Sequence, residues 1–151
     1  MLTSAAPENV ISLLVIDDSR DRAEKYINAI RNAGIAVHAN RLDTEEQLTD
    51  SLEQGLPDMV LCSCDSTRIG VSEAMNAFRE HKEIPLLLLY HEKKDQDRAP
   101  LINAMRLGAR DIIPRDDLNH LQLAVKRELD GLHTRRALSV MGAKLQESED
   151  R

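Results

Sequence analysis

Short apolar runs alternate with amphipathic segments along most of this chain. Five of the runs have the length and composition of strands: Leu13–Ile16, Ile35–Ala39, Met59–Cys62, Leu86–Leu89 and Ile112–Ile113. The run that begins at Leu86 is continuously apolar, which is typical of a strand buried on both faces of a parallel sheet. The pattern therefore predicts five strands in a largely buried sheet.

The segments between these runs have the three-four apolar spacing of helices. Ser19 is a candidate N-cap for the first helix. Thr44-Glu45-Glu46-Gln47 has the pattern of a capping box at the start of the second. Further helices are predicted to begin near Val71, Pro100 and Leu118.

Alternation of strands and helices implies βαβ units with right-handed crossovers. We therefore predict an α/β fold, a flavodoxin-like, doubly wound, five-stranded parallel sheet with flanking helices and an extended C-terminal helix. In such a sheet a ligand site lies at the carboxyl ends of strands one and three. Asp17, Asp18 and Ser63 map to those ends. No glycine-rich phosphate loop follows the first strand, which excludes a dinucleotide-binding site.

The last helical segment carries two apolar stripes. The first ends at Leu132 and is expected to pack on the sheet. The second follows at Leu138, Met141 and Leu145, and an exposed stripe of this kind usually contacts a partner helix. We therefore predict a flexible leader at residues 1–9 and a domain at residues 10–132. Residues 133–151 are predicted to form a helical extension that mediates a homodimer or leads into an output domain.

Composition excludes several classes of function. A formal net charge of -6 and an aromatic content of two tyrosines and one phenylalanine argue against nucleic-acid binding. No apolar run approaches the length of a membrane span, so no membrane partner is expected. Cys62 and Cys64 lie two apart on one strand and fit neither a disulfide nor a metal site. Without an export signal, a cytoplasmic location is expected.

The acidic pair Asp17-Asp18 closes the first strand and is the leading candidate for chemistry. Carboxylates at a strand end often only cap a turn. Two adjacent carboxylates also suit a hard divalent cation, which prefers oxygen ligands. The third strand opens with the turn signal Pro57-Asp58 and ends at Ser63.

An acidic pair after strand one and a Pro-Asp-led strand three resemble the receiver domain of two-component response regulators. The resemblance covers roughly residues 11–132. In that family the pair that matches Asp17 and Asp18 helps to hold magnesium. The residue that matches Ser63 is the aspartate that accepts phosphate from a histidine kinase. Serine removes that nucleophile and one carboxylate ligand, so the resemblance implies a vestigial site that binds Mg²⁺ weakly, with no other cofactor.

Other positions of the family's machinery are also altered. Tyr90 aligns with the Thr or Ser that contacts the phosphoryl oxygens, and His91 aligns with the small residue after it. Arg115 aligns with the lysine of strand five, and Asp116 stands where a proline usually follows. The cis peptide usually found at that junction is not expected here, because a non-proline cis bond costs about 2.5–4 kcal/mol.

These replacements predict a blocked pocket. We expect Tyr90 to fill the space that a phosphate would need and to offer its hydroxyl to Asp18 or Arg115. Arg115 is expected to pair with Asp17 or Asp18 in place of the metal. The alternative is that Arg115 and His91 are solvated surface residues.

Three functional hypotheses follow. The first is a non-enzymatic, phosphorylation-independent pseudo-receiver that acts as an interaction or dimerisation module. It would use the C-terminal helix, or the face made by helix four, strand five and helix five. Similar domains stand at the front of larger signalling proteins, including enzymes of cyclic-di-GMP metabolism.

The second hypothesis is a competent phospho-acceptor that uses Asp65 or Ser63. A carboxylate displaced by two residues is poorly placed for in-line transfer, and no general base is evident for the Ser63 hydroxyl. The third hypothesis is a flavodoxin-like domain that binds a small ligand in the same crevice.

Overall fold

The structure is a computed structural model that describes residues 10–93 and 99–149, with residues 135–149 described by their backbone alone. Its sheet has the parallel strand order β2-β1-β3-β4-β5. The strands are β1 (Ile11–Ile16), β2 (Val37–Leu42), β3 (Met59–Ser63), β4 (Leu86–Tyr90) and β5 (Asp111–Pro114). The helices are α1 (Arg20–Asn32), α2 (Glu45–Gln54), α3 (Val71–Ala77), α4 (Ala99–Leu107) and α5 (Leu118–Glu149).

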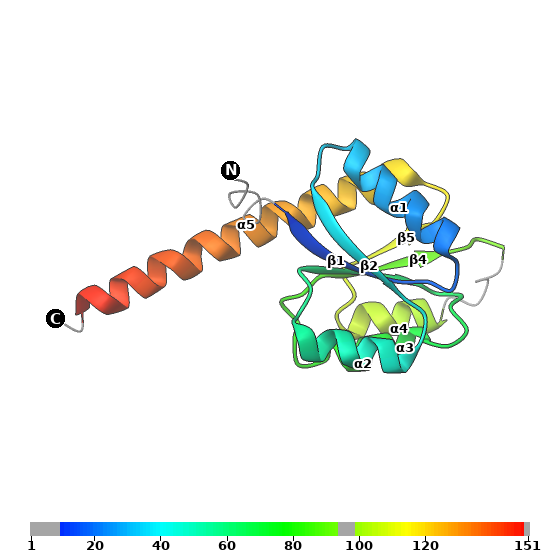
Figure 1. Ribbon diagram of the computed structural model, residues 1–151, viewed down its shortest axis with the longest axis horizontal. Helices are drawn as coiled ribbons and strands as arrows, with labels where there is room; N and C mark the ends of the chain where they lie inside the picture. Colours follow the sequence, from blue (N-terminus) through cyan, green and yellow to red (C-terminus); the bar gives the residue numbers. More distant parts are fainter. Residues whose placement is uncertain (1–9, 94–98, 150–151) are drawn as a thin grey trace.

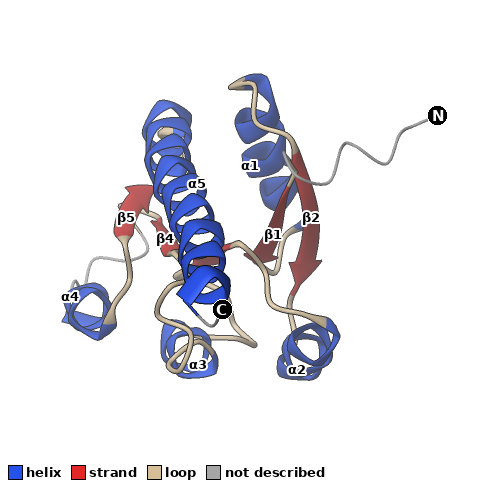
Figure 2. Cartoon of the chain, turned by 90° about the vertical axis from the view of Figure 1, so that its left-hand side faces the viewer, coloured by secondary structure: helices blue, strands red, loops and turns tan. Residues whose placement is uncertain are grey.

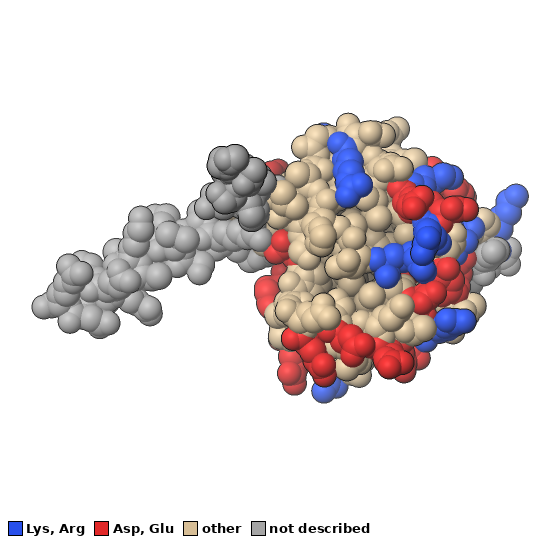
Figure 3. Space-filling view, viewed as in Figure 1, with Lys and Arg blue, Asp and Glu red and all other residues tan. Residues whose placement is uncertain are grey.

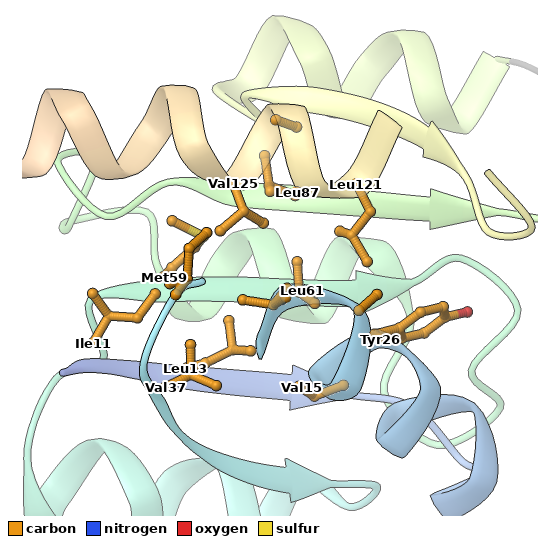
Figure 4. Close-up of a cluster of buried hydrophobic side chains, with 14 of the residues drawn as sticks. Ile11, Leu13, Val15, Tyr26, Val37, Met59, Leu61, Leu87, Leu121 and Val125 are labelled. Carbon is orange, nitrogen blue, oxygen red and sulfur yellow. The ribbon is translucent and has the colours of Figure 1, made fainter. Parts of the chain in front are cut away.

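Helices cover both faces of the sheet. In Figures 1 and 2, α1 and α5 lie on one face, and α2, α3 and α4 lie on the other. Each face has its own apolar core, and one of them is drawn in Figure 4. The fold is the predicted flavodoxin-like α/β fold with five parallel strands.

Local signals in the sequence place the first two helices correctly. The Ser19 side chain accepts a hydrogen bond from the Arg22 amide and caps α1. Gly34, with φ of 87°, adopts the left-handed conformation after this helix. Thr44 and Gln47 form the predicted capping box of α2, in which each side chain bonds the other residue's backbone amide.

The second strand differs from its prediction. Residues 35–39 were expected, but β2 spans Val37–Leu42. The reason is the turn after α1, in which the Ile35 amide still bonds the Ile30 carbonyl at 3.4 Å. Ile35 therefore belongs to the turn that closes α1 rather than to the strand, although its side chain is buried in the core.

The last helix is continuous from Leu118 to Glu149, and Figure 1 shows it extending beyond the sheet. Leu121, Val125 and Leu132 are buried, as the first apolar stripe predicts. The side chains of the second stripe and the predicted leader at residues 1–9 lie outside the described residues. The boundary at residue 132 remains a prediction. Among the described helices, none has both the length and the apolar character needed to cross a membrane.

Candidate functional site

Asp17 is the centre of the site at the carboxyl ends of the strands. Its side chain has no solvent exposure. One carboxylate oxygen accepts a hydrogen bond from the Ser19 amide at 2.8 Å, and the other accepts one from the Ser63 hydroxyl. Parallel pairing of β1 with β3, in which Ile16 stands opposite Cys62, brings Asp17 and Ser63 together.

Arg22 supplies the positive charge that Asp17 requires. Its Nη2 lies 2.9 Å from Oδ1 of Asp17, and its Nε lies 3.3 Å from Oδ2. This two-pronged arrangement is the strongest geometry for an arginine–carboxylate pair. Hydrogen bonding to Asp17 raises the pKa of Arg22. The buried carboxylate is therefore held by an internal cation.

Arg22 was not among the site residues predicted from the sequence. Ser19 caps α1 and so places Arg22 on the first turn of the helix, within reach of Asp17, which follows β1. A basic residue five positions after a strand-end aspartate, with a helix cap between them, is the signal that could have found it.

Asp65 and Arg115 form a second ion pair in the site. Nη1 of Arg115 lies 2.8 Å from Oδ2 of Asp65, and both side chains are largely buried, with 13% and 16% exposure. Nη2 of Arg22 lies 4.0 Å from Oδ1 of Asp65, which joins the two pairs. The predicted pairing of Arg115 with Asp17 or Asp18 is therefore wrong. Arg115 forms its ion pair with Asp65, and Asp17 is paired with Arg22. The alternative of a solvated Arg115 is wrong too.

Asp18 hydrogen-bonds the loop after β3 and belongs to neither ion pair. Its Oδ2 accepts hydrogen bonds from the backbone amide and from the hydroxyl of Thr67, each at 2.8 Å. Thr67 belongs to the loop after β3, so Asp18 ties that loop to the end of β1. Asp18 thereby uses one carboxylate oxygen to fix the backbone beside the site.

Tyr26 brings a buried hydroxyl to the edge of the site. Tyr26 belongs to the same buried cluster as Val15 and Leu61, and Figure 4 shows its hydroxyl directed towards the carboxyl ends of the strands. That hydroxyl has no hydrogen-bond partner in the described part of the chain. Burial, together with the nearby Asp17 charge, raises the pKa of Tyr26 to about 12. The neighbouring Ser63 hydroxyl would lower this pKa if it hydrogen-bonded Tyr26, but it is not placed to do so.

Tyr90 and His91 lie beside this network, in a surface hollow of about 470 Å³ that Arg115 also lines. The Tyr90 side chain is partly buried against the α3–α4 side of the core. The Arg115 amide donates to the Tyr90 carbonyl at 2.9 Å, and the peptide bonds of the described chain are all trans. Contact of the Tyr90 hydroxyl with Asp18 or Arg115 remains a prediction.

Two arginines compete with a magnesium ion for these carboxylates. Asp17 is occupied by Arg22, Ser19 and Ser63, and one oxygen of Asp65 is occupied by Arg115. Oδ1 of Asp18 and Oδ1 of Asp65 are buried without a hydrogen-bond partner in the described structure. Within the residues that the structure describes, no three His, Cys, Asp or Glu side chains are grouped so as to hold a metal. Weak binding of magnesium at Asp17 and Asp18 remains a prediction.

Comparisons with known proteins support the fold. Neither the protein-family models nor the curated proteins contain a match to this sequence. NtrX from Brucella abortus, solved in complex with ATP, is similar over 87% of this chain, with 18% identity and a TM-score of 0.70. The chain spans only 29% of that NtrX chain.

Two further solved structures match over nearly their whole length. A putative response regulator from Chloroflexus aurantiacus is 24% identical over 80% of this chain and 98% of its own, with a TM-score of 0.65. A CheY-like receiver domain protein from Methanospirillum hungatei is 13% identical over 83% and 98%, with a TM-score of 0.67. This chain therefore has the fold of a response regulator receiver domain.

Proposed function

We propose that this chain is a pseudo-receiver, a non-enzymatic interaction module whose output does not depend on phosphorylation. The observation that carries the proposal is the bidentate ion pair between Arg22 and the buried Asp17. A fixed guanidinium there takes up the carboxylate on which a receiver would place its metal, and Ser63 stands where the acceptor would be.

Phosphoryl transfer needs a nucleophile and a means of neutralising the incoming charge. Ser63 is only 1% exposed, and its hydroxyl donates to Asp17. The Asp17 carboxylate is already shared by Arg22 and the Ser19 amide. Ser63 is therefore neither accessible to a phosphodonor nor paired with a free base.

Asp65 gives the second candidate function, a relocated phospho-acceptor. Its Oδ1 is buried and has no hydrogen-bond partner in the described structure, and it faces Arg22 at 4.0 Å. Against this role, the Arg115 guanidinium holds the other oxygen at 2.8 Å and would have to be displaced. The pseudo-receiver is the better-supported function.

Phosphorylation is tested by incubating the purified chain with magnesium and a small acyl phosphate, then measuring the intact mass. We expect no phosphate adduct. A stoichiometric adduct that hydroxylamine removes would overturn the proposal, because that reagent cleaves acyl phosphates but not phosphoserine. Loss of such an adduct in Asp65→Asn would assign it to Asp65, whereas an adduct that resists hydroxylamine and disappears in Ser63→Ala would assign it to Ser63.

The module is proposed to act in the cytoplasm through a homodimer or through an attached output domain, such as a cyclic-di-GMP enzyme. The short coverage of NtrX is consistent with a receiver that forms part of a longer protein. Ending the chain after Leu132 should weaken self-association in analytical ultracentrifugation. If self-association were unchanged, the dimer contact would instead be expected on the face of α4, β5 and α5, where Ile102, Met105 and Leu123 are exposed.

The surface hollow beside Tyr90 is the observation that favours a small-ligand binder. Its lining includes His91, Lys93 and Asp116, so a ligand there would be polar. Native mass spectrometry of freshly purified protein tests this alternative. We expect the mass of the chain without a retained ligand.

A further inference from the structure

The groove between α2 and α3 is a second surface, separate from the ion pairs of the site. It has a volume of about 500 Å³, and its lining does not include Asp17, Ser63, Asp65 or Arg115. Its apolar lining comes from Leu48, Leu52 and Ala77. Leu52 and Ala77 are only partly buried, so the groove offers apolar surface to a partner.

Acidic side chains surround this apolar lining. Glu45 and Glu53 of α2 and Glu73 of α3 line the groove and are exposed. None of the three is ion-paired to another residue of the described chain. The sequence has no lysine or arginine from residue 42 to residue 67, and α3 has none. Figure 3 shows acidic side chains along the lower side of the molecule, over α2.

Such a groove has the properties of a receptor for an amphipathic helix with basic residues. An apolar channel receives the apolar side chains of the incoming helix, and the charged border selects a helix of opposite sign. Uncompensated carboxylates on both sides repel an acidic helix and attract a basic one. The charge therefore fixes the chemistry of the partner.

The C-terminal segment of this chain has that chemistry. Residues 132–146 include Arg135, Arg136 and Lys144 and contain no acidic residue, and the apolar stripe Leu138, Met141 and Leu145 runs through them. The backbone is helical through this segment, as part of α5. At 1.5 Å per residue the helix from residue 133 to residue 149 is roughly 25 Å long, whereas the ten residues of α2 span roughly 15 Å. The segment is therefore long enough to follow the groove.

We propose that the C-terminal helix of a second copy of this chain docks in the acidic α2–α3 groove, so that two copies exchange their terminal helices. The inference rests on the proposed function as an interaction module and names the surface that receives the helix. Contacts with Leu48, Leu52 and Ala77 bury apolar surface of the incoming helix, and the three glutamates orient its basic side chains.

The experiment compares full-length variants by sedimentation velocity over a range of concentrations. Glu45→Gln/Glu53→Gln/Glu73→Gln should raise the dimer dissociation constant at least about tenfold, because several attractions between exposed charges are removed together. The matched control, Asp21→Asn/Glu24→Gln/Glu80→Gln, removes three exposed carboxylates outside the groove and should leave the constant unchanged. Circular dichroism verifies that each variant is folded.

Charge-reversal variants test directly whether the groove and the tail attract each other. Glu45→Lys/Glu53→Lys/Glu73→Lys and Arg135→Glu/Arg136→Glu should each fail to self-associate, because groove and tail then carry charge of the same sign. Mixing the two variants should restore a dimer, since each tail meets a groove of opposite charge.

Two results would overturn the inference. A wild-type chain that stays monomeric at about 100 μM, far above the Kd of a stable pair, would remove the second copy as the occupant. A dimer that needs the tail but is insensitive to the groove variants would indicate pairing of the two tails with each other. Neither result bears on phosphorylation, which intact mass measures separately, so failure of this inference is distinguishable from failure of the proposed function.

Discussion

Replacing Arg22 with methionine is the sharpest test of the internal ion pair. The change keeps much of the apolar stem of the side chain but removes the two nitrogen donors that contact Asp17 at 2.9 and 3.3 Å. Asp17 is fully buried and would retain only the Ser19 amide and the Ser63 hydroxyl as partners. The carboxylate would then be a buried charge without a cation.

The expected loss of stability follows from this geometry. Removing one partner of a buried ion pair typically costs about 3–5 kcal/mol. Two hydrogen bonds remain to Asp17, and the Arg22 side chain is 30% exposed, so water can reach the space that the guanidinium leaves. We therefore expect Arg22→Met to lower the free energy of unfolding by about 2–3 kcal/mol. In urea this corresponds to a midpoint lower by roughly 1–2 M, measured by far-ultraviolet circular dichroism.

Two controls isolate the charge. Arg20→Met changes an exposed arginine of the same helix and should leave the midpoint within error. Asp17→Asn/Arg22→Met removes the buried charge together with its partner and should recover most of the loss. The reasoning is refuted if Arg22→Met costs less than about 0.5 kcal/mol, the range of an ordinary surface substitution. It is equally refuted if the double variant is no more stable than the single one.

Magnesium extends the same test. In the wild-type chain, magnesium at about 10 mM should not shift the urea midpoint, because a ligand stabilises a fold only when it binds the folded state. In Arg22→Met, Asp17 is freed, and the midpoint should rise with magnesium. A midpoint that rises with magnesium in the wild-type chain would contradict the expectation that this site binds the ion only weakly.

Two further predictions concern Tyr26 and Ser63. Because the pKa of Tyr26 is raised from 10.0 to about 12, its neutral hydroxyl stabilises the fold fully below pH 10, and this stability is lost as pH rises through 12. Comparing urea midpoints at about pH 8 and about pH 11 should show a fall in the wild-type chain that is smaller in Tyr26→Phe, and an equal fall in both would rule out the buried hydroxyl as its source. Ser63→Asp should remain unphosphorylated by a small acyl phosphate and should lower the free energy of unfolding by about 1–3 kcal/mol in a urea titration, since a second carboxylate beside the buried Asp17 is repelled by it. Rapid phosphorylation of that variant would show that the pocket is still functional.

The sequence by itself determined the order of the elements and the place of the site. Apolar runs of strand length, separated by helical segments, leave few topologies that bury every run, and the parallel sheet is among them. Capping at Ser19 and Thr44 was readable because it depends on residues within one turn of each other. The position of Asp17 and Ser63 at neighbouring strand ends followed from the fold, because parallel strands end at the same edge.

Only the tertiary structure decided how the charges pair. Arg115 could be assigned to the site from its place after β5, but whether it meets Asp17, Asp18 or Asp65 depends on how the loop after β3 folds, and Asp18 fixes that loop through Thr67. By contrast, Arg22 lies five residues after Asp17 and meets it from the capped first turn of α1, which is a local contact. Ion pairs between elements depend on ångström-scale distances set by packing, whereas the periodicity of a sequence specifies only which face of an element is buried.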